Sequence, residues 1–423
     1  MEETCNSRTL TWLVKSCRPN PNAETRRKNA FASRLSDHPP SANRPENHLD
    51  PSPFSSLPDD LLLECLSRVS HSSLPSVALV CRRWSRTVDS PAFHDLRRTL
   101  GRLRHTLYAV AVSDYGIFSA THRVGSGVPW KISPFPGIEA LPSEIFDGSF
   151  SHARMLALGR HIYVIGRAAT VRCDAWTGSV SRRTPMLFPR KKFAAAAVGG
   201  RIYVSGGTAR TAGVEEYDPE ADAWRVVAES PRRRYGCVGA AADGVFYAIG
   251  GLKIGGRGEA ATRGGRLEAH VYASSMDLYD VAAGAWMRSR HVPGGGCVVA
   301  ACEAGAGIYV VASHAVELSF WRCEGRRGSA GFGEWCRLKS PPVPPQVRLD
   351  GAVRFCCVGI GEKRVGLVQV FGCIDDLLRR SGRMARGFRE GLVLVYDSEV
   401  GEWSRGPDLP EIFQRSACVC VEC

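Results

Sequence analysis

Six tryptophans close six similar segments between residue 104 and the C-terminus: Trp130, Trp176, Trp224, Trp286, Trp335 and Trp403. Successive tryptophans lie 46 to 68 residues apart, a spacing typical of repeat architectures. The most regular segment reads PRKKFAAAAVGGRIYVSGG at 189–207 and continues as VEEYDPEADAW at 214–224. The next segment reads PRRRYGCVGAAADGVFYAIGG at 231–251 and ends as MDLYDVAAGAW at 276–286. The segments at 151–176, from 297 to Trp335 and from 355 to Trp403 are degenerate copies.

Each repeat has the pattern of a four-stranded sheet. An apolar run, a glycine turn and an IYV-like strand are followed by a tyrosine-containing strand and a tryptophan strand. Such a sheet cannot bury both of its faces alone, so neighbouring sheets must stack around an axis. We therefore predict a mainly β fold, a six-bladed β-propeller over residues 104–423.

The first and last segments indicate how the ring closes. The first repeat begins at HTLYAVAV and lacks an opening apolar strand, whereas the chain ends in an unassigned strand, SACVCVEC. Pairing the two would remove an exposed sheet edge. We expect the C-terminal strand to complete the first blade.

Several other segments have distinct compositions. Residues 1–53 are rich in polar residues and proline, which predicts a disordered tail. The Gly/Arg-rich inserts at 252–269 and 372–391 predict loops. The apolar stretch at 297–318 is interrupted by Glu303 and three glycines, which favours a β-hairpin over a membrane span. The N-terminus lacks the pattern of a secretory signal, so we expect a cytoplasmic or nuclear location.

Residues 54–98 predict a small three-helix domain. Pro58 suits the first turn of a helix that carries Leu61, Leu62, Cys65, Leu66 and Val69. A second helix, after Ser73, carries Val77, Val80, Cys81, Trp84 and Val88, and a third carries Phe93, Leu96 and Leu100. A unit this small buries only part of its apolar surface, and we expect the remainder to contact a partner.

The segment FSSLPDDLLLECLSRVSHSSLPSVALVCRRWSRTVDSPAF resembles an F-box over residues 54–93. The Leu57-Pro58-Asp59-Asp60-Leu61 opening and the Val80-Cys81-Arg82-Arg83-Trp84 centre carry the resemblance. It implies binding to a Skp-type adaptor and, through that adaptor, to a cullin. The adaptor contacts that it implies are Leu57, Pro58, Leu61, Leu62, Leu66, Val80 and Cys81. Trp84 is expected to act mainly in the domain core.

The repeats resemble kelch motifs, with glycine pairs at Gly206-Gly207 and Gly250-Gly251 and with the pairs Tyr217/Trp224 and Tyr279/Trp286. An F-box followed by kelch repeats is similar to the plant F-box/kelch-repeat family. The resemblance implies a substrate-recognition subunit of an SCF-type ubiquitin ligase, which recruits a target for ubiquitination and proteasomal degradation. The chain would then be a non-catalytic adaptor; the alternative is an interaction scaffold that acts outside any ligase.

The net charge of +13 favours an acidic partner. Arg190 and Arg234 each lie 12 residues before the apolar residue that precedes the strand tyrosine, so they are equivalent positions in adjacent blades. Kelch receptors often bind acidic peptides at this rim. The predicted target contacts are therefore Arg190, Lys192, Arg233, Arg234 and Tyr235.

Other functional classes have weaker support in the sequence. The sixteen cysteines lie mostly within apolar runs, which indicates reduced core thiols, and no second cysteine pair with zinc spacing accompanies Cys420 and Cys423. We expect no metal and no cofactor, since P-loop, GxSxG and HExxH motifs are absent from the sequence. A propeller enzyme would need paired carboxylates or bound metal at the ring centre. A nucleic-acid binder would need a basic stripe with interleaved aromatics.

Overall fold

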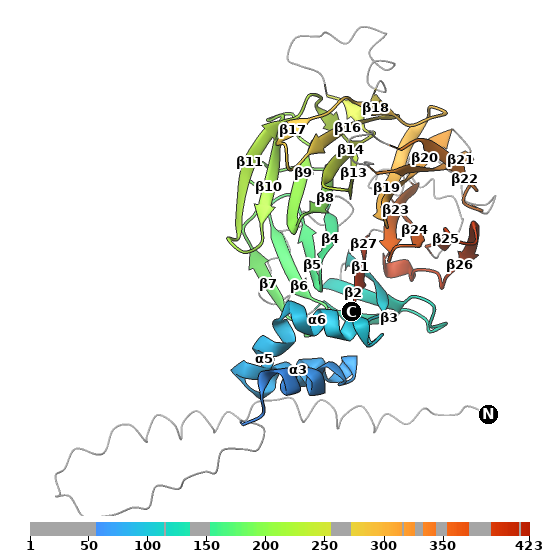
Figure 1. The fold of residues 1–423 in the computed structure, drawn as a ribbon. Helices are drawn as coiled ribbons and strands as arrows, with labels where there is room; N and C mark the ends of the chain where they lie inside the picture. Colours follow the sequence, from blue (N-terminus) through green and yellow to red (C-terminus); the bar gives the residue numbers. More distant parts are fainter. Residues whose placement is uncertain are drawn as a thin grey trace, which may run out of the picture. The chain divides into compact units, whose positions relative to one another are not determined.

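The repeated segments fold into antiparallel sheets arranged around a central channel in the computed structural model (Figure 1). The structure describes residues 56–113, 116–135, 153–254, 272–314, 317–325, 333–343, 353–371, 391–413 and 416–423. Nearly all of them belong to one unit, Pro58–Cys423. The predicted disordered tail at 1–53 and most of the two predicted loops at 252–269 and 372–391 lie outside the described residues.

Six sheets of four or five strands are formed by the described residues, which confirms the predicted six-bladed propeller. Blade 1 contains β27 (Ala417–Glu422), β1 (His105–Ser113), β2 (Gly116–Arg123) and β3 (Lys131–Pro134). Blade 2 contains β4 (Arg154–Leu158), β5 (His161–Ile165), β6 (Thr170–Asp174) and β7 (Val180–Arg183). Blade 3 contains β8 (Ala194–Val198), β9 (Arg201–Ser205), β10 (Gly213–Asp218) and β11 (Ala223–Glu229).

The next three blades follow in chain order. Blade 4 contains β13 (Val238–Ala242), β14 (Val245–Ile249), β16 (Ser275–Asp280), β17 (Ala285–Trp286) and β18 (Arg290–His291). Blade 5 contains β19 (Cys297–Ala304), β20 (Gly307–His314), β21 (Glu317–Glu324) and β22 (Trp335–Leu338). Blade 6 contains β23 (Val353–Ile360), β24 (Arg364–Phe371), β25 (Val393–Asp397) and β26 (Glu402–Arg405), followed by a 3-10 turn, η7 (Glu411–Phe413). A short ladder joins β12 (Arg234–Tyr235) to β15 (Leu252–Lys253).

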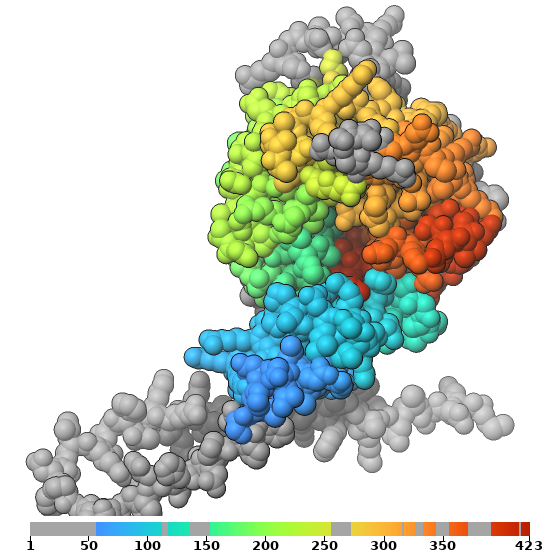
Figure 2. All heavy atoms as spheres, viewed as in Figure 1, coloured from blue at the N-terminus to red at the C-terminus, as the bar shows by residue number. Residues whose placement is uncertain are grey.

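The C-terminal strand closes the ring, as the sequence predicted. β27 pairs antiparallel with β1, with a register that runs from His105 opposite Glu422 to Val110 opposite Ala417. In the space-filling view the dark red C-terminal strand is visible in the hollow between the green and orange blades (Figure 2). The edge of blade 1 is therefore paired within the chain, which protects it from pairing with another chain.

The predicted hairpin at 297–318 is confirmed. β19 and β20 pair antiparallel, and the turn between them contains Gly305, whose φ is +55°. Within the described part of the chain, no helix is long and apolar enough to cross a membrane.

The tryptophans that mark the repeats do not all lie on a strand. Trp224, Trp286, Trp335 and Trp403 lie on the fourth strands, whereas Trp130 directly precedes β3 and Trp176 lies in the turn between β6 and β7. Trp176 is nevertheless buried, because it packs against the helices that precede the propeller.

Among the described residues, four α-helices precede the propeller: α3 (Asp59–Ser67), α4 (Leu74–Val80), α5 (Arg82–Asp89) and α6 (Pro91–Thr99), with a 3-10 turn, η1 (His71–Ser73), before α4. We call residues 59–99 the helical module. The predicted continuous helix from Val77 to Val88 was wrong. Cys81 adopts an extended conformation (φ −162°), and its Sγ accepts a hydrogen bond from the Trp84 backbone N–H at 3.5 Å. Cys81 therefore ends α4 and caps α5.

Candidate functional site

The helical module has its own small core. Leu62, Leu66, Leu74 and Phe93 are buried at 4% exposure or less. Leu62 and Leu66 were predicted to contact the adaptor, and this prediction was wrong, because both side chains are enclosed within the module. The apolar residues of α3 that face the core and those that face solvent recur at the same helical spacing. The sequence pattern therefore could not distinguish the two groups.

Other apolar side chains of the module face solvent. Leu79 is 85% exposed, Val80 59% and Leu61 49%, and Pro58 and Cys81 are also exposed. The remaining predicted contact, Leu57, is half-buried. Leu79 was missed by the sequence analysis because it lies outside the helical stripe that we expected through Val88. The break at Cys81 places Leu79 and Val80 together at the end of α4, as an exposed apolar pair.

The helical module is joined to blade 2 by a buried arginine. The Arg160 guanidinium donates to the Val88 carbonyl at 2.9 Å and forms ion pairs with Asp89 and, at 2.8 Å, with Asp174. It also lies over the Trp176 ring, 4.8 Å from the centroid. Burial alone would raise the pKa of Asp174, but the hydrogen bond from His161 and the charge of Arg160 hold it well below its usual range. Asp174 is therefore ionised at neutral pH.

Aromatic contacts reinforce this junction. Phe93 of α6 meets Trp176 edge-on, with ring centroids 5.4 Å apart, and His94 stacks on the same ring. Arg97, also in α6, is 1% exposed and donates to the Ser67 and Val69 carbonyls at 3.0 and 2.8 Å. These carbonyls lie at the end of α3, so Arg97 connects α3 to the helix that contacts the propeller.

The two ends of each blade lie at opposite faces of the propeller. Because adjacent strands are antiparallel, the turns after the first and third strands lie at one end, and the turns after the second and fourth lie at the other. Arg160 follows the first strand of blade 2, and Trp176 follows the third. The helical module therefore contacts the first of these faces. Arg167, after the second strand, and Lys191, after the fourth, belong to the opposite face.

A pocket of about 710 Å³ lies on that opposite face, across blades 2, 3 and 4. Four of its described lining residues are cationic, and none is acidic: Arg167, Lys191, Arg210 and Lys253. Tyr235 adds an aromatic wall, and the Lys192 ammonium lies 5.6 Å from the centre of its ring. We call this site the basic pocket. Its chemistry suits a carboxylate-rich or otherwise anionic segment.

The structure contradicts the predicted target-binding role of Arg190 and Arg234. Each is 1% exposed. Arg190 pairs with Glu215 at 2.7 Å, and Arg234 pairs with Asp277 at 2.8 Å. A target cannot reach either guanidinium, because each is enclosed within its own blade.

The other three predicted residues lie at or near the surface of this face. Arg233 is exposed, Lys192 is half-buried, and Tyr235 lines the basic pocket. None of the four cations that line the pocket was predicted from the sequence: Arg167, Lys191, Arg210 and Lys253. A signal was present for Arg167, Arg210 and Lys253, since each follows the glycine that ends an IYV-like strand by one to four residues.

The central channel forms a second cavity, of about 390 Å³. The first strands of the blades line it, mostly with alanine, glycine, valine and cysteine side chains. Among the described residues, no group of three or more His, Cys, Asp or Glu side chains could hold a metal ion.

Comparisons with known proteins give matches in both the helical module and the propeller. A family model of the F-box domain matches residues 54–96, and a model of the Kelch motif matches residues 189–231, which include blade 3. The F-box/kelch-repeat protein At5g26960 of Arabidopsis thaliana is 55% identical over 428 residues, covering 100% of both chains. The F-box/kelch-repeat protein At1g67480 of the same plant is 27% identical, covering 58% of this chain and 64% of its own. This chain belongs to the F-box/kelch-repeat protein family.

Proposed function

We propose that this chain is a substrate-recognition subunit of an SCF-type cullin-RING ubiquitin ligase. The helical module binds a Skp-type adaptor, and the propeller recruits a target protein for ubiquitination and degradation. The observation that carries the proposal is the exposed apolar surface of the F-box segment, centred on Leu79 and Val80. Such a surface is stabilised when a partner covers it.

The proposed mechanism requires no catalytic group in this chain. A receptor of this kind raises the effective concentration of a target lysine near the ubiquitin-charged enzyme. The contacts of Arg160 and Trp176 hold the helical module on blade 2, so the distance from adaptor to target would be set by the propeller. The basic pocket lies on the opposite face, where a bound target would not compete with the adaptor.

The adaptor contact is tested by co-purification of the full chain with a Skp-type adaptor. Leu79→Asp/Val80→Asp places two charges in the proposed interface and should weaken binding by roughly 30-fold or more, since a buried unpaired charge costs several kcal/mol. Val400→Asp is the matched control, because Val400 is 72% exposed on blade 6. Undiminished adaptor binding by the double variant would contradict the proposal.

The target contact is proposed for the basic pocket, with an acidic segment as the ligand. Arg210→Glu/Lys253→Glu reverses two exposed charges of the pocket and should remove the target from purified complexes, because like charges then face each other. Lys131→Glu/Arg337→Glu makes the same charge change on blades 1 and 5 and should leave target recovery unchanged. Equal losses in both variants would indicate a nonspecific charge effect and contradict a pocket-based target site.

A scaffold that acts outside any ligase is the alternative function. It would use the same two surfaces, so the two functions differ only in what happens to the target. A ligase target should accumulate when the proteasome is inhibited, and a scaffold partner should not.

A further inference from the structure

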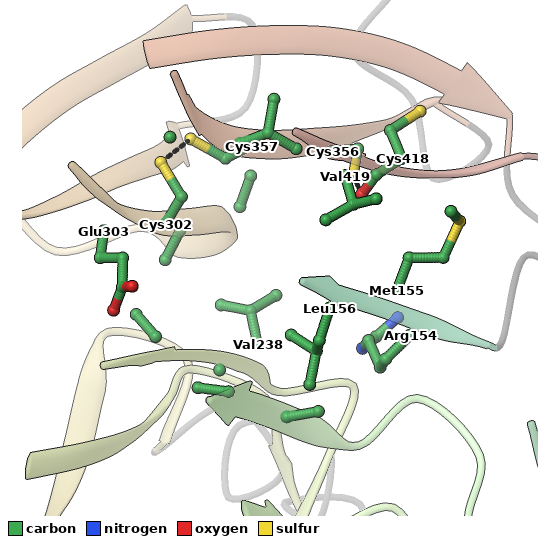
Figure 3. Close-up of a pocket in the computed structure, with 18 of the residues that line it drawn as sticks. Arg154, Met155, Leu156, Val238, Cys302, Glu303, Cys356, Cys357, Cys418 and Val419 are labelled. Atoms are coloured by element: carbon green, nitrogen blue, oxygen red, sulfur yellow. Dashed lines mark hydrogen bonds between the residues drawn. The ribbon is translucent and has the colours of Figure 1, made fainter. Parts of the chain in front are cut away.

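Two cysteines from neighbouring blades meet at the wall of the central channel. Cys302 lies on β19 of blade 5 and Cys357 on β23 of blade 6, and their Sγ atoms are 3.0 Å apart (Figure 3). A disulfide bond is only about 1 Å shorter than this separation. The two thiols are therefore already placed so that a small movement would join them.

The neighbouring thiols provide an internal comparison. Cys356 precedes Cys357 on β23, and since successive side chains of a strand point to opposite faces, it points toward blade 1. There its thiol lies 3.5 Å from the Cys418 carbonyl oxygen, which accepts its hydrogen bond. Cys297, at the start of β19, is exposed. Cys302 and Cys357 thus form a thiol-to-thiol contact between blades 5 and 6, whereas Cys356 contacts both the thiol and the carbonyl of Cys418 in blade 1.

Small solutes have a route to this pair. Cys302 and Cys357 both line the 390 Å³ channel. Most buried cysteines behave as small apolar side chains within a core. This pair differs because it combines a neighbouring sulfur with a cavity large enough for a small oxidant.

We propose that Cys302 and Cys357 are a redox-sensitive modification site, at which a peroxide forms a disulfide that joins blades 5 and 6. Peroxide first oxidises one thiol to a sulfenic acid and releases one water. The second thiol then attacks that sulfur, forms the S–S bond and releases a second water. Two S–H bonds and one O–O bond are lost for each disulfide formed.

The surroundings assign an order to these steps. Burial raises the pKa of Cys302, and the adjacent Cys357 raises it further, so Cys302 stays a thiol at neutral pH. Cys357 is half-buried whereas Cys302 is buried, so peroxide reaches Cys357 first and Cys302 resolves the sulfenic acid. This site is independent of the adaptor and target surfaces and does not rest on the proposed ligase function.

Peptide mapping of the folded full chain after brief exposure to hydrogen peroxide tests the proposal. Trypsin should release a disulfide-linked pair of peptides, residues 291–322 and 355–363, which contain Cys302 and Cys357. Cys302→Ser and Cys357→Ser should each abolish the link. Cys297→Ser and Cys356→Ser, which remove the other cysteine of each peptide, should retain it.

Two further measurements keep the test decisive if a serine variant folds poorly. Phenylarsine oxide, which bridges two adjacent thiols, should bind the reduced wild-type chain and lose that binding after peroxide treatment. Oxidation should also raise the Tm of the wild-type chain by roughly 5 °C, because the link constrains the unfolded chain. The absence of the linked peptides in folded wild-type protein would overturn the proposal, as would a link that survives in Cys357→Ser and is lost in Cys356→Ser.

Discussion

Blades 3 and 4 differ from blades 5 and 6 in the side-chain contacts that they contain. In blade 3, Arg190 donates to the Gly206 carbonyl at 2.7 Å and to the Glu215 carboxylate. In blade 4, Arg234 donates in the same way to Gly250, at 2.7 Å, and to Asp277. We call these two groups the arginine clusters. Blades 5 and 6 lack the glycine pair of the repeat, and their facing inner strands present cysteines.

The comparison explains what the glycine pair does. A Cβ atom on Gly207 would lie 2.6 Å from the Lys191 carbonyl oxygen, and one on Gly206 would lie 2.7 Å from that of Arg234. The glycines let the rim loops approach closely enough for each arginine to reach a backbone carbonyl. The basic pocket spans blades 2, 3 and 4, so the arginine clusters fix the loops that blades 3 and 4 contribute to it.

Arg190→Ala should have the largest effect. It leaves the fully buried Glu215 carboxylate without its ion pair, which should cost about 3–5 kcal/mol of unfolding free energy in a denaturant titration. Arg225→Ala is the matched control, since Arg225 pairs with Glu216 on the same blade but is 67% exposed; its cost should stay below about 1 kcal/mol. Similar losses in the two variants would show that the buried cluster has no special role.

Gly207→Ala should have the next largest effect. Its φ is +73°, and the added methyl group would meet the Lys191 carbonyl and the Phe193 Cβ, so we expect a loss of roughly 3 kcal/mol. Gly295 has a similar φ of +74° but open space around it, so Gly295→Ala should cost only about 1 kcal/mol. Thermal unfolding measures the difference, and equal costs would mean that close packing at Gly207 is unimportant.

The smallest expected effect concerns pH, and it has opposite signs in blades 4 and 5. Burial alone would raise the pKa of Asp277, but the hydrogen bond and charge of Arg234 lower it, so its contribution to stability is lost only in acid. In blade 5, burial raises the pKa of Glu303 to about 7, against an ordinary value of 4.5. Its contribution is present below pH 4.5 and is lost as the pH rises through 7.

Glu303→Gln should therefore flatten the pH dependence of unfolding between pH 4.5 and 7.5. The change should be at most about 1 kcal/mol, because the side chain is exposed at the wall of the channel. Denaturant titrations at several pH values measure this slope. An unchanged slope would show that Glu303 does not titrate in this range.

The sequence predicted the architecture well, because each repeat in the sequence corresponds to one repeated unit of the structure. The six tryptophans marked six blades, and SACVCVEC was placed correctly as the closing strand. The individual site residues were harder to predict. The shared offset of Arg190 and Arg234 correctly indicated equivalent positions, but that equivalence reflects a shared internal ion pair. Glu215 and Asp277 lie 25 and 43 residues further along, so no local pattern revealed the pairing.

The residues of the proposed adaptor surface were also hard to predict from local sequence patterns. Helical spacing identified Leu62, Leu66 and Val80 as apolar positions of one kind, yet only Val80 is exposed. Which of these side chains is exposed depends on how Arg97 and Phe93 pack, and both contact Trp176 of blade 2, which lies 79 and 83 residues later in the chain.

The most direct test of the proposed function is quantitative affinity purification from proteasome-inhibited cells, with the wild-type chain, Leu79→Asp/Val80→Asp and Arg210→Glu/Lys253→Glu compared side by side. We predict that the first variant loses the Skp-type adaptor and cullin but retains the target. The second should retain the ligase subunits and lose the target. If either variant loses both sets of partners while remaining folded, or if neither loses any, adaptor and target do not bind separate faces and the account is contradicted.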